Sequence, residues 1–251
     1  GLTATAVTAV TEQYNGTSWG EVNNLNTARF GVGTGATNTA ALMFAGETAT
    51  ALSADTESWN GYVWTEVNNL NTARKEGSGS GTATSALSNG GDTGSLTAIV
   101  ESWNGTSWTE VGDLNTAKSL TGSTGADNTS ALVFGGKTPP TVAQTELWNG
   151  SSWTEVNDLN LARTKVAGAG IATATLAFGG NPTPAKPGAT ESWNGTNWTN
   201  ENVFSTGREA LAGTGTSTVA IAFGGGSPVS NATEEWNGTG LHTKTLTTTE
   251  D

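Results

Sequence analysis

A single phrase of eleven residues recurs along the chain, and this repetition restricts the folds open to it. "ESWNGTSWTEV" runs from Glu101 to Val111, and close variants occupy 57–67, 146–156 and 191–201. Steps of 43–45 residues separate its first aromatic positions, which are Tyr14, Trp59, Trp103, Trp148, Trp193 and Trp236. Self-similarity at a fixed period of 20–50 residues indicates an array of small structural units, each packed on its neighbours.

The sequence between these phrases has the pattern of short strands and turns. Runs such as "TSALVFGG" and "TATLAFGG" alternate in polarity and are interrupted by Gly, Asn and Pro, and we find no helical periodicity over three turns. Each unit contains a Gly-rich strand, an apolar strand ending in Phe-Gly-Gly, and two strands that carry the aromatic residues. Asn-Gly between the last two predicts a tight hairpin, because both residues tolerate positive φ.

Four short strands per unit of this length describe a β-propeller blade. The Gly-rich and apolar strands occur five times, and the aromatic hairpin occurs six times. We therefore predict an all-β fold, a single five-bladed propeller over residues 1–251 with repeats starting near 30, 75, 119, 164 and 208. Residues 1–29 supply a closing hairpin, and the Gly-rich strands surround a narrow central channel with little room for a large ligand.

We expect strands from the two termini to close the ring. Either Tyr14–Leu25 pairs into the blade that begins at Arg208, or the last copy, Trp236–Leu246, completes that blade. The last copy has Leu241 where the other copies have their second tryptophan. We therefore favour a closure in which "SWGEV" from the N-terminal copy replaces this weak outer strand.

The repeat resembles the kelch repeat, which combines a di-glycine after an apolar strand with two spaced aromatic residues. The pattern in one unit is Phe134-Gly135-Gly136, followed by Trp148 and Trp153. The resemblance covers almost the whole chain and implies a β-propeller, although the spacing of the aromatic residues is tighter than in ordinary kelch repeats. The units are also similar to Trp-Asn-Gly-rich repeats of phage and of marine viral or bacterial reading frames.

Composition restricts both the core and the partners. Hydrophobic residues make up 34% of the chain and charged residues 13%, but there are ten tryptophans, so the core must combine a few large aromatics with small residues. The formal net charge of −12 argues against nucleic acid or an anionic membrane as the main partner. No apolar run is long enough to span a membrane. Because the first residue is Gly, we expect an excerpt of a longer product or a processed chain.

Two repeated charged positions could form ion-binding rings, but pairing with each other is the simpler expectation. A glutamate lies two residues before each first aromatic, and a basic residue recurs at Arg29, Arg74, Lys118, Arg163 and Arg208. A buried carboxylate without a cation would be costly, so we expect ion pairs between neighbouring blades. We likewise expect the tryptophans to be core wedges and not a sugar-binding platform, whereas Tyr62, which replaces the usual Thr in one hairpin, is the candidate for an exposed ring.

We predict no catalytic, cofactor-binding or metal site. There is no cysteine, and the single histidine, His242, lies in the degenerate last copy, so a nucleophile with a histidine base cannot be assembled. No phosphate-binding GxxxxGK[ST] motif occurs. A carboxylate-based hydrolase is the weakest alternative, because nearly all the acidic residues sit at repeated positions.

The repeat symmetry breaks in the loops between the second and third strands, which hold all six prolines. Variable loops on an invariant scaffold are where recognition usually resides. The candidate surface-recognition residues are Glu47, Asp92, Lys137, Asn181, Lys186, Ser227 and Tyr62.

These features together predict a non-enzymatic interaction module. We expect a phage or virion-associated tail or surface protein, on the virion or outside the cell, that binds a protein partner or a host-surface glycan. The alternative is a secreted bacterial adhesin or lectin-like module.

Overall fold

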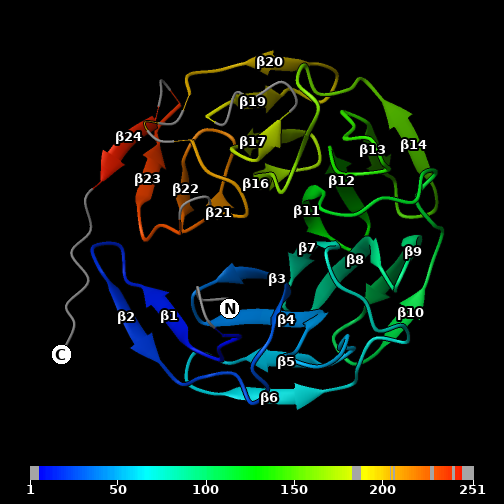
Figure 1. Cartoon of the computed structure of the whole chain (residues 1–251), viewed down its shortest axis with the longest axis vertical. Coiled ribbons are helices and arrows are strands. Elements are labelled where there is room, and N and C mark those ends of the chain that lie inside the picture. The colour runs from blue at the N-terminus through cyan, green and yellow to red at the C-terminus, as the bar shows by residue number, and fades with distance from the viewer. Residues whose placement is uncertain are drawn as a thin grey trace.

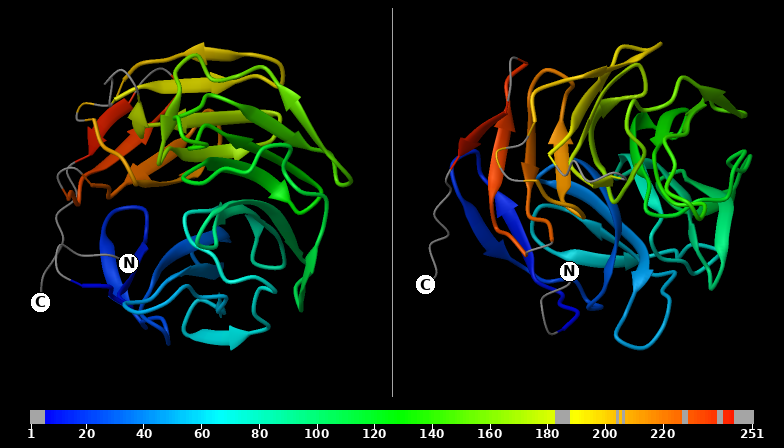
Figure 2. Two further views of the ribbon diagram at one scale, coloured as in Figure 1. Left: turned by 45° about the vertical axis from the view of Figure 1, so that its right-hand side comes forward. Right: turned by 45° about the horizontal axis from the view of Figure 1, so that its top comes forward.

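The computed structural model describes residues 6–182, 188–203, 205, 207–226, 229–238 and 241–244, which contain strands and turns and no helix. Five small antiparallel sheets of four strands each are arranged around a central axis (Figure 1). The oblique views show the twisted sheets standing face to face around that axis (Figure 2). The predicted five-bladed β-propeller is thus confirmed.

In each blade the strands follow chain order from the axis outward. The first blade contains β3 (Phe30–Thr37), β4 (Ala40–Glu47), β5 (Thr56–Trp59) and β6 (Trp64–Val67). The second contains β7 (Ser78–Thr82), β8 (Ser85–Asp92), β9 (Leu96–Trp103) and β10 (Trp108–Glu110). The third contains β11 (Gly122–Asp127), β12 (Ser130–Phe134), β13 (Thr145–Trp148) and β14 (Trp153–Val156).

The fourth blade contains β16 (Ala167–Ile171), β17 (Ala174–Phe178), β19 (Thr190–Trp193) and β20 (Trp198–Asn200). The fifth contains β21 (Ala212–Gly215), β22 (Ala220–Phe223), β23 (Thr233–Trp236) and β24 (Leu241–Lys244). Two further sheets have two strands each. They are β1 (Thr11–Tyr14) with β2 (Trp19–Val22), and β15 (Arg163–Thr164) with β18 (Asn181–Pro182).

The aromatic hairpins form as predicted, but their turn differs from the expected one. Trp103 pairs directly with Trp108, which leaves a loop of four residues and not of two. Within this loop Gly105 has a φ of 92°, whereas Asn104 is not in the left-handed region. The Asn104 side chain instead accepts hydrogen bonds from the backbone N–H groups of Thr106 and Ser107, both at 2.9 Å. Asn is therefore used for its side-chain acceptor and Gly for its backbone freedom.

Aromatic contacts between neighbouring blades form much of the core. The second tryptophan of a blade packs against the phenylalanine of the preceding blade, as Trp198 does on Phe134 with ring centroids 5.2 Å apart. The indole N–H of Trp198 also donates to Thr145 Oγ1 in that blade at 3.2 Å. All the described tryptophans except Trp19 and Trp64 are buried. Most of the repeated tryptophans are thus core wedges, as predicted.

The N-terminal hairpin β1–β2 stands between the fifth and first blades (Figure 1). Trp19 packs against Phe223 of the fifth blade, with ring centroids 4.7 Å apart. On the other side, the indole N–H of Trp64 in the first blade donates to Thr11 Oγ1 at 3.2 Å. Elements from both ends of the chain thus meet at the closure of the ring.

The expected exchange of the outer strand is wrong. The "SWGEV" segment pairs only with β1, and the last copy provides its own outer strand, β24, on β23. The backbone ladder of β24 forms even with Leu241 at the tryptophan position, because antiparallel pairing depends on main-chain groups that any side chain leaves in place.

We expect Trp153→Ala to lower the free energy of unfolding by about 3–5 kcal/mol, the usual loss when a buried tryptophan is replaced by alanine and leaves a cavity. Trp153 is only 6% exposed and packs against Trp148. The measurement is equilibrium denaturation of both proteins. Tyr62→Ala is the matched control, since Tyr62 is 79% exposed and its loss should change the free energy by no more than about 0.5 kcal/mol. A change below about 1 kcal/mol for Trp153→Ala would contradict its role as a core wedge.

Candidate functional site

In each blade a buried glutamate binds the linker that leads into that blade. Glu101 of β9 accepts hydrogen bonds from the backbone N–H of Asn71 at 2.7 Å and of Thr72 at 3.2 Å. It also pairs with Arg74 Nη1 at 2.6 Å. The same ion pair recurs as Arg29–Glu57, Lys118–Glu146, Arg163–Glu191 and Arg208–Glu234.

These pairs correct one detail of the sequence prediction. Arg74 lies in the linker four residues before the start of β7, and Glu101 lies in β9 of the same sheet, so both partners belong to one repeat and not to neighbouring blades. The glutamate thereby ties the incoming linker to its own blade. Both side chains are almost fully buried. Neither the acidic nor the basic series is therefore available as an ion-binding ring.

Burial lowers the pKa of two arginines in these pairs. It lowers the pKa of Arg163 to about 10, against the opposing influence of Glu191. Burial also lowers the pKa of Arg74, although Glu101 acts to raise it. Because the charged guanidinium loses hydration here, each pair is stable only while its carboxylate and linker hydrogen bonds remain complete.

The variable loops all begin beside these linkers. The second glycine of Phe-Gly-Gly donates its N–H to the carbonyl oxygen of the basic residue that enters the next blade, as Gly136 does to Arg163 at 2.9 Å. The residue after it then bridges back to its own linker, as Lys137 does to Ser119. The loop bases are thus fixed around one end of the propeller axis. We call this end the axial mouth.

A cavity of about 630 Å³ lies at the axial mouth. Its innermost residues come two positions after each basic residue, and they are Gly31, Glu76, Leu120, Lys165 and Ala210. The last four have φ between 53° and 56°, a left-handed conformation that is unfavourable for residues other than glycine. Strained backbone of this kind often marks functional positions.

Three hydrogen bonds around the axis link these four strained residues in sequence. Leu120 N–H donates to the Glu76 carbonyl at 2.6 Å, Lys165 N–H to the Leu120 carbonyl at 2.7 Å, and Ala210 N–H to the Lys165 carbonyl at 3.1 Å. This chain of main-chain bonds passes from the second blade to the fifth. The mouth is therefore a rigid surface built from backbone.

The side chains at the axial mouth combine an apolar centre with charges of both signs. Leu120, Phe30 and Val229 line the cavity, and Val229 is 71% exposed. Lys165 pairs with Glu209 at 2.7 Å in the same region. Lys75 and Glu47, at the bases of neighbouring loops, form a second partly exposed pair at 2.9 Å.

The structure gathers four of the sequence-predicted recognition residues at the axial mouth. Each directly follows the glycine pair and bridges to a linker residue; they are Glu47, Asp92, Lys137 and Asn181. Lys186 and Ser227 lie outside the described residues. Tyr62 belongs to the hairpin between β5 and β6, at the opposite end of the strands from the loop between β4 and β5, so it is not part of this surface.

Sequence reasoning missed the inner ring that includes Glu76, Leu120, Lys165 and Ala210. These residues differ from one unit to the next at a fixed offset of two after the basic residue. That fixed offset is a signal in the sequence, but variation at a single position is less conspicuous than variation of whole loops.

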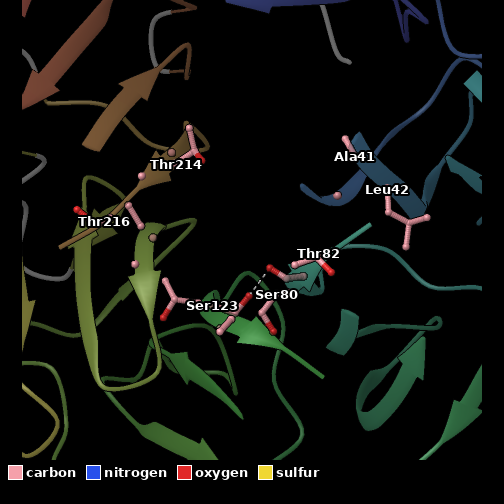
Figure 3. A pocket seen from close by; sticks show the side chains of 18 of the residues that line it. Ala41, Leu42, Ser80, Thr82, Ser123, Thr214 and Thr216 are labelled. Carbon is pink, nitrogen blue, oxygen red and sulfur yellow. Dashed lines mark hydrogen bonds between the residues drawn. The ribbon is translucent and has the colours of Figure 1, made fainter. Parts of the chain in front are cut away.

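The central channel is wider than expected. A cavity of about 780 Å³ lies on the axis. Most of its lining residues are small or hydroxyl-bearing residues of the inner strands, and the larger ones are Leu42, Met43, Trp64 and Phe223. Figure 3 shows Ser80, Ser123 and Thr214 around it, from β7, β11 and β21. No charged side chain is among the described residues that line it. The glycines do allow close packing between inner strands, but they also remove the side chains that would fill the axis.

Among the described residues, no three His, Cys, Asp or Glu side chains gather in a way that could hold a metal ion. The same part of the chain has no helix long and apolar enough to cross a membrane. No protein-family model matches the chain, and no curated protein matches it.

We expect Glu101→Gln to lower the free energy of unfolding by about 3–5 kcal/mol, because it leaves Arg74 buried without a counter-charge. Glu47→Gln removes a charge from the partly exposed pair with Lys75, so it should cost no more than about 1 kcal/mol. Equilibrium denaturation of the two variants in the same buffer tests the difference. Equal losses in both variants would show that the buried pairs do not hold the linkers.

Proposed function

We propose that the chain is a non-enzymatic interaction module that binds a protein partner or a host surface through its axial mouth. The observation that carries this proposal is the separation of constant from variable residues. The repeated charges and most of the repeated tryptophans are buried in the scaffold. The residues two positions after each basic residue differ between units, and they line one cavity at one end of the axis.

The chemistry of the axial mouth favours a protein partner over a glycan. Apolar residues at the centre of a contact surface, with charged residues at its rim, are the usual arrangement of protein interfaces. At the axial mouth Leu120, Phe30 and Val229 provide apolar residues, and the Lys165–Glu209 and Lys75–Glu47 pairs provide charged ones. Glycan platforms, by contrast, depend on exposed aromatic rings, and the exposed ring of Tyr62 lies at the other end of the strands.

The finer part of the proposal is a role on a virion or outside the cell, as a tail or surface component. It rests on the similarity between units, which indicates recent tandem duplication, and on the similarity to repeats of phage and marine viral reading frames. A kelch-like ancestry of the blades belongs to the same proposal.

A site-specific crosslinking experiment tests the proposed surface. A photoreactive amino acid replaces Val229 at the axial mouth or, as the matched control, Thr106 in an exposed hairpin at the other end of the strands. Each variant is irradiated with extract of the cells or particles that contain the protein. We expect one discrete protein adduct from position 229 and none from position 106. An excess of the same protein without the photoreactive residue should abolish the adduct at position 229.

Two results would contradict this proposal. Equal adducts from both positions would mean that the axial mouth has no special affinity. Binding to a glycan array that disappears when the loop at 137–142 is replaced would instead establish the lectin-like alternative.

A further inference from the structure

The hairpin β1–β2 has the position and contacts of the outer half of a sixth blade. Leu25 N–H donates to the Ala9 carbonyl at 3.0 Å, as Leu70 N–H does to the Ala54 carbonyl in the first blade. Trp64 donates to Thr11 across the blade boundary, as Trp108 donates to Thr56 one blade later. By these equivalences β1 corresponds to a third strand and β2 to a fourth.

The inner half of this sixth unit has no counterpart in the described part of the chain. Each complete blade places two strands between its third strand and the axis, whereas β1 pairs with β2 alone. A cavity of about 430 Å³ occupies the corresponding space, bounded by β1, β21, β22 and the turn between β3 and β4. We call it the open sector. Four residues line both this cavity and the axial channel, so the two are continuous: Ala41, Trp64, Thr214 and Phe223.

The fifth blade is uncovered on the side that faces the open sector. In a complete neighbour, Phe134 is fully buried, and a Cβ placed on Gly168 of the next inner strand would lie 3.0 Å from its ring. The equivalent ring of Phe223 is only half-buried and packs against Trp19 of the outer hairpin. Exposed residues predominate in β21, whereas the equivalent strand β16 has buried ones.

The glycine pair of the fifth blade shows the same deficit. A Cβ on Gly135 would lie 2.6 Å from the carbonyl oxygen of Arg163, which enters the next blade, and the same contact constrains Gly90 and Gly179. The equivalent Cβ on Gly224 would have Ser230 as its nearest neighbour, at 4.0 Å. Within the described part of the chain, no linker carbonyl oxygen therefore lies beside Gly224 as it does at the equivalent glycines.

Glu12 adds a charge to the open sector. Its five equivalents, Glu57, Glu101, Glu146, Glu191 and Glu234, are all buried against a linker and a basic residue. Glu12 is exposed, lines the open sector and forms no ion pair within the described residues. By analogy with these equivalents, the carboxylate of Glu12 would bind a segment that offers linker N–H groups and a basic side chain.

We propose that the open sector is a docking site for a β-hairpin of the chain's own inner-half type. Such a hairpin begins with an Asn-x-x-Arg linker, continues as a Gly-rich strand, and returns as an apolar strand that ends in Phe-Gly-Gly. Its arginine would pair with Glu12, its glycines would accommodate the ring of Phe223, and its apolar strand would extend the β1–β2 sheet. Addition of a strand to an exposed sheet edge is an established mode of peptide binding.

The probe is a synthetic peptide with the sequence of residues 160–180, which contains all three features and comes from the fourth blade. Titration calorimetry of the whole chain should show saturable binding with one peptide per chain. Hydrogen exchange should slow in β1, because its inner edge, which faces the axis, gains a partner strand. A scrambled peptide of the same composition is the control. Absence of binding, or equal binding of the scrambled peptide, would overturn the proposal.

Charge variants locate the binding. Glu12→Gln should lower the affinity of the chain for the peptide by at least about tenfold, since it removes a charge-assisted contact. Glu21→Gln removes the same charge from the adjacent exposed strand position and should change the affinity by less than about twofold. A peptide with Arg163→Gln should bind the wild-type chain as weakly as the normal peptide binds the Glu12→Gln variant. Equal effects of Glu12→Gln and Glu21→Gln would overturn the assignment of Glu12.

A second copy of the chain could compete for the same space. Sedimentation of the peptide-free protein tests this occupant. A dimer that the peptide does not dissociate, with β1 protected from hydrogen exchange before any peptide is added, would show that a second copy fills the open sector and would overturn the proposal. These outcomes are independent of the crosslinking at the axial mouth, because Val229 does not line the open sector.

Discussion

The buried glutamate that holds each linker is the contact on which the rest of the structure depends. Glu101 receives the backbone of Asn71 and Thr72 and the charge of Arg74 in one cluster. A linker held in this way enters its blade at a fixed position, which places the basic residue's carbonyl group against the preceding blade. There, that carbonyl accepts a hydrogen bond from the second glycine of Phe-Gly-Gly. One ion pair thus sets the position of its own blade and also the loop base of the preceding blade.

The glycine pair fixes the point at which each variable loop begins at the axial mouth. Because Gly135 and Gly136 have positive φ and lie against the next linker, a side chain at either position would collide with backbone. The chain therefore turns sharply at this point in each unit before its sequence becomes variable, with Ala45, at a φ of 57°, in place of the first glycine in the first unit. The loops differ in length and composition, yet each starts from the same place. This explains how an array of near-identical units presents residues as different as Glu47, Lys137 and Asn181 at equivalent positions, each paired with a residue at the start of its own repeat.

Much of this could be predicted from the sequence, because the determinants are local and repeated. Asn-Gly turns, paired tryptophans such as Trp103 and Trp108, and the matching series of acidic and basic residues indicated blades, hairpins and ion pairs. Contacts between units were harder to predict. The period alone does not say that Arg74 pairs within its own blade, nor that Leu120 adopts a left-handed conformation. Nor could the count of strands show how wide the axis would be, since that depends on the distance between inner strands.

Because the five blades repeat the same contacts, the open sector stands out as the place where those contacts are not made. Five units bury their glutamate, and three of them bury the phenylalanine that precedes the glycine pair, which is Phe44, Phe134 or Phe178. In the first four units the second glycine also lies against a carbonyl group of the next linker. At the open sector all three conditions fail together, at Glu12, Phe223 and Gly224. Three unrelated interactions, one electrostatic, one apolar and one steric, would each be restored by the same inner strand pair. Glu12 lies at the opposite end of the sequence from Phe223 and Gly224. Independent drift at both ends would not produce deficits that one element repairs, so they are best explained as the parts of a single docking site.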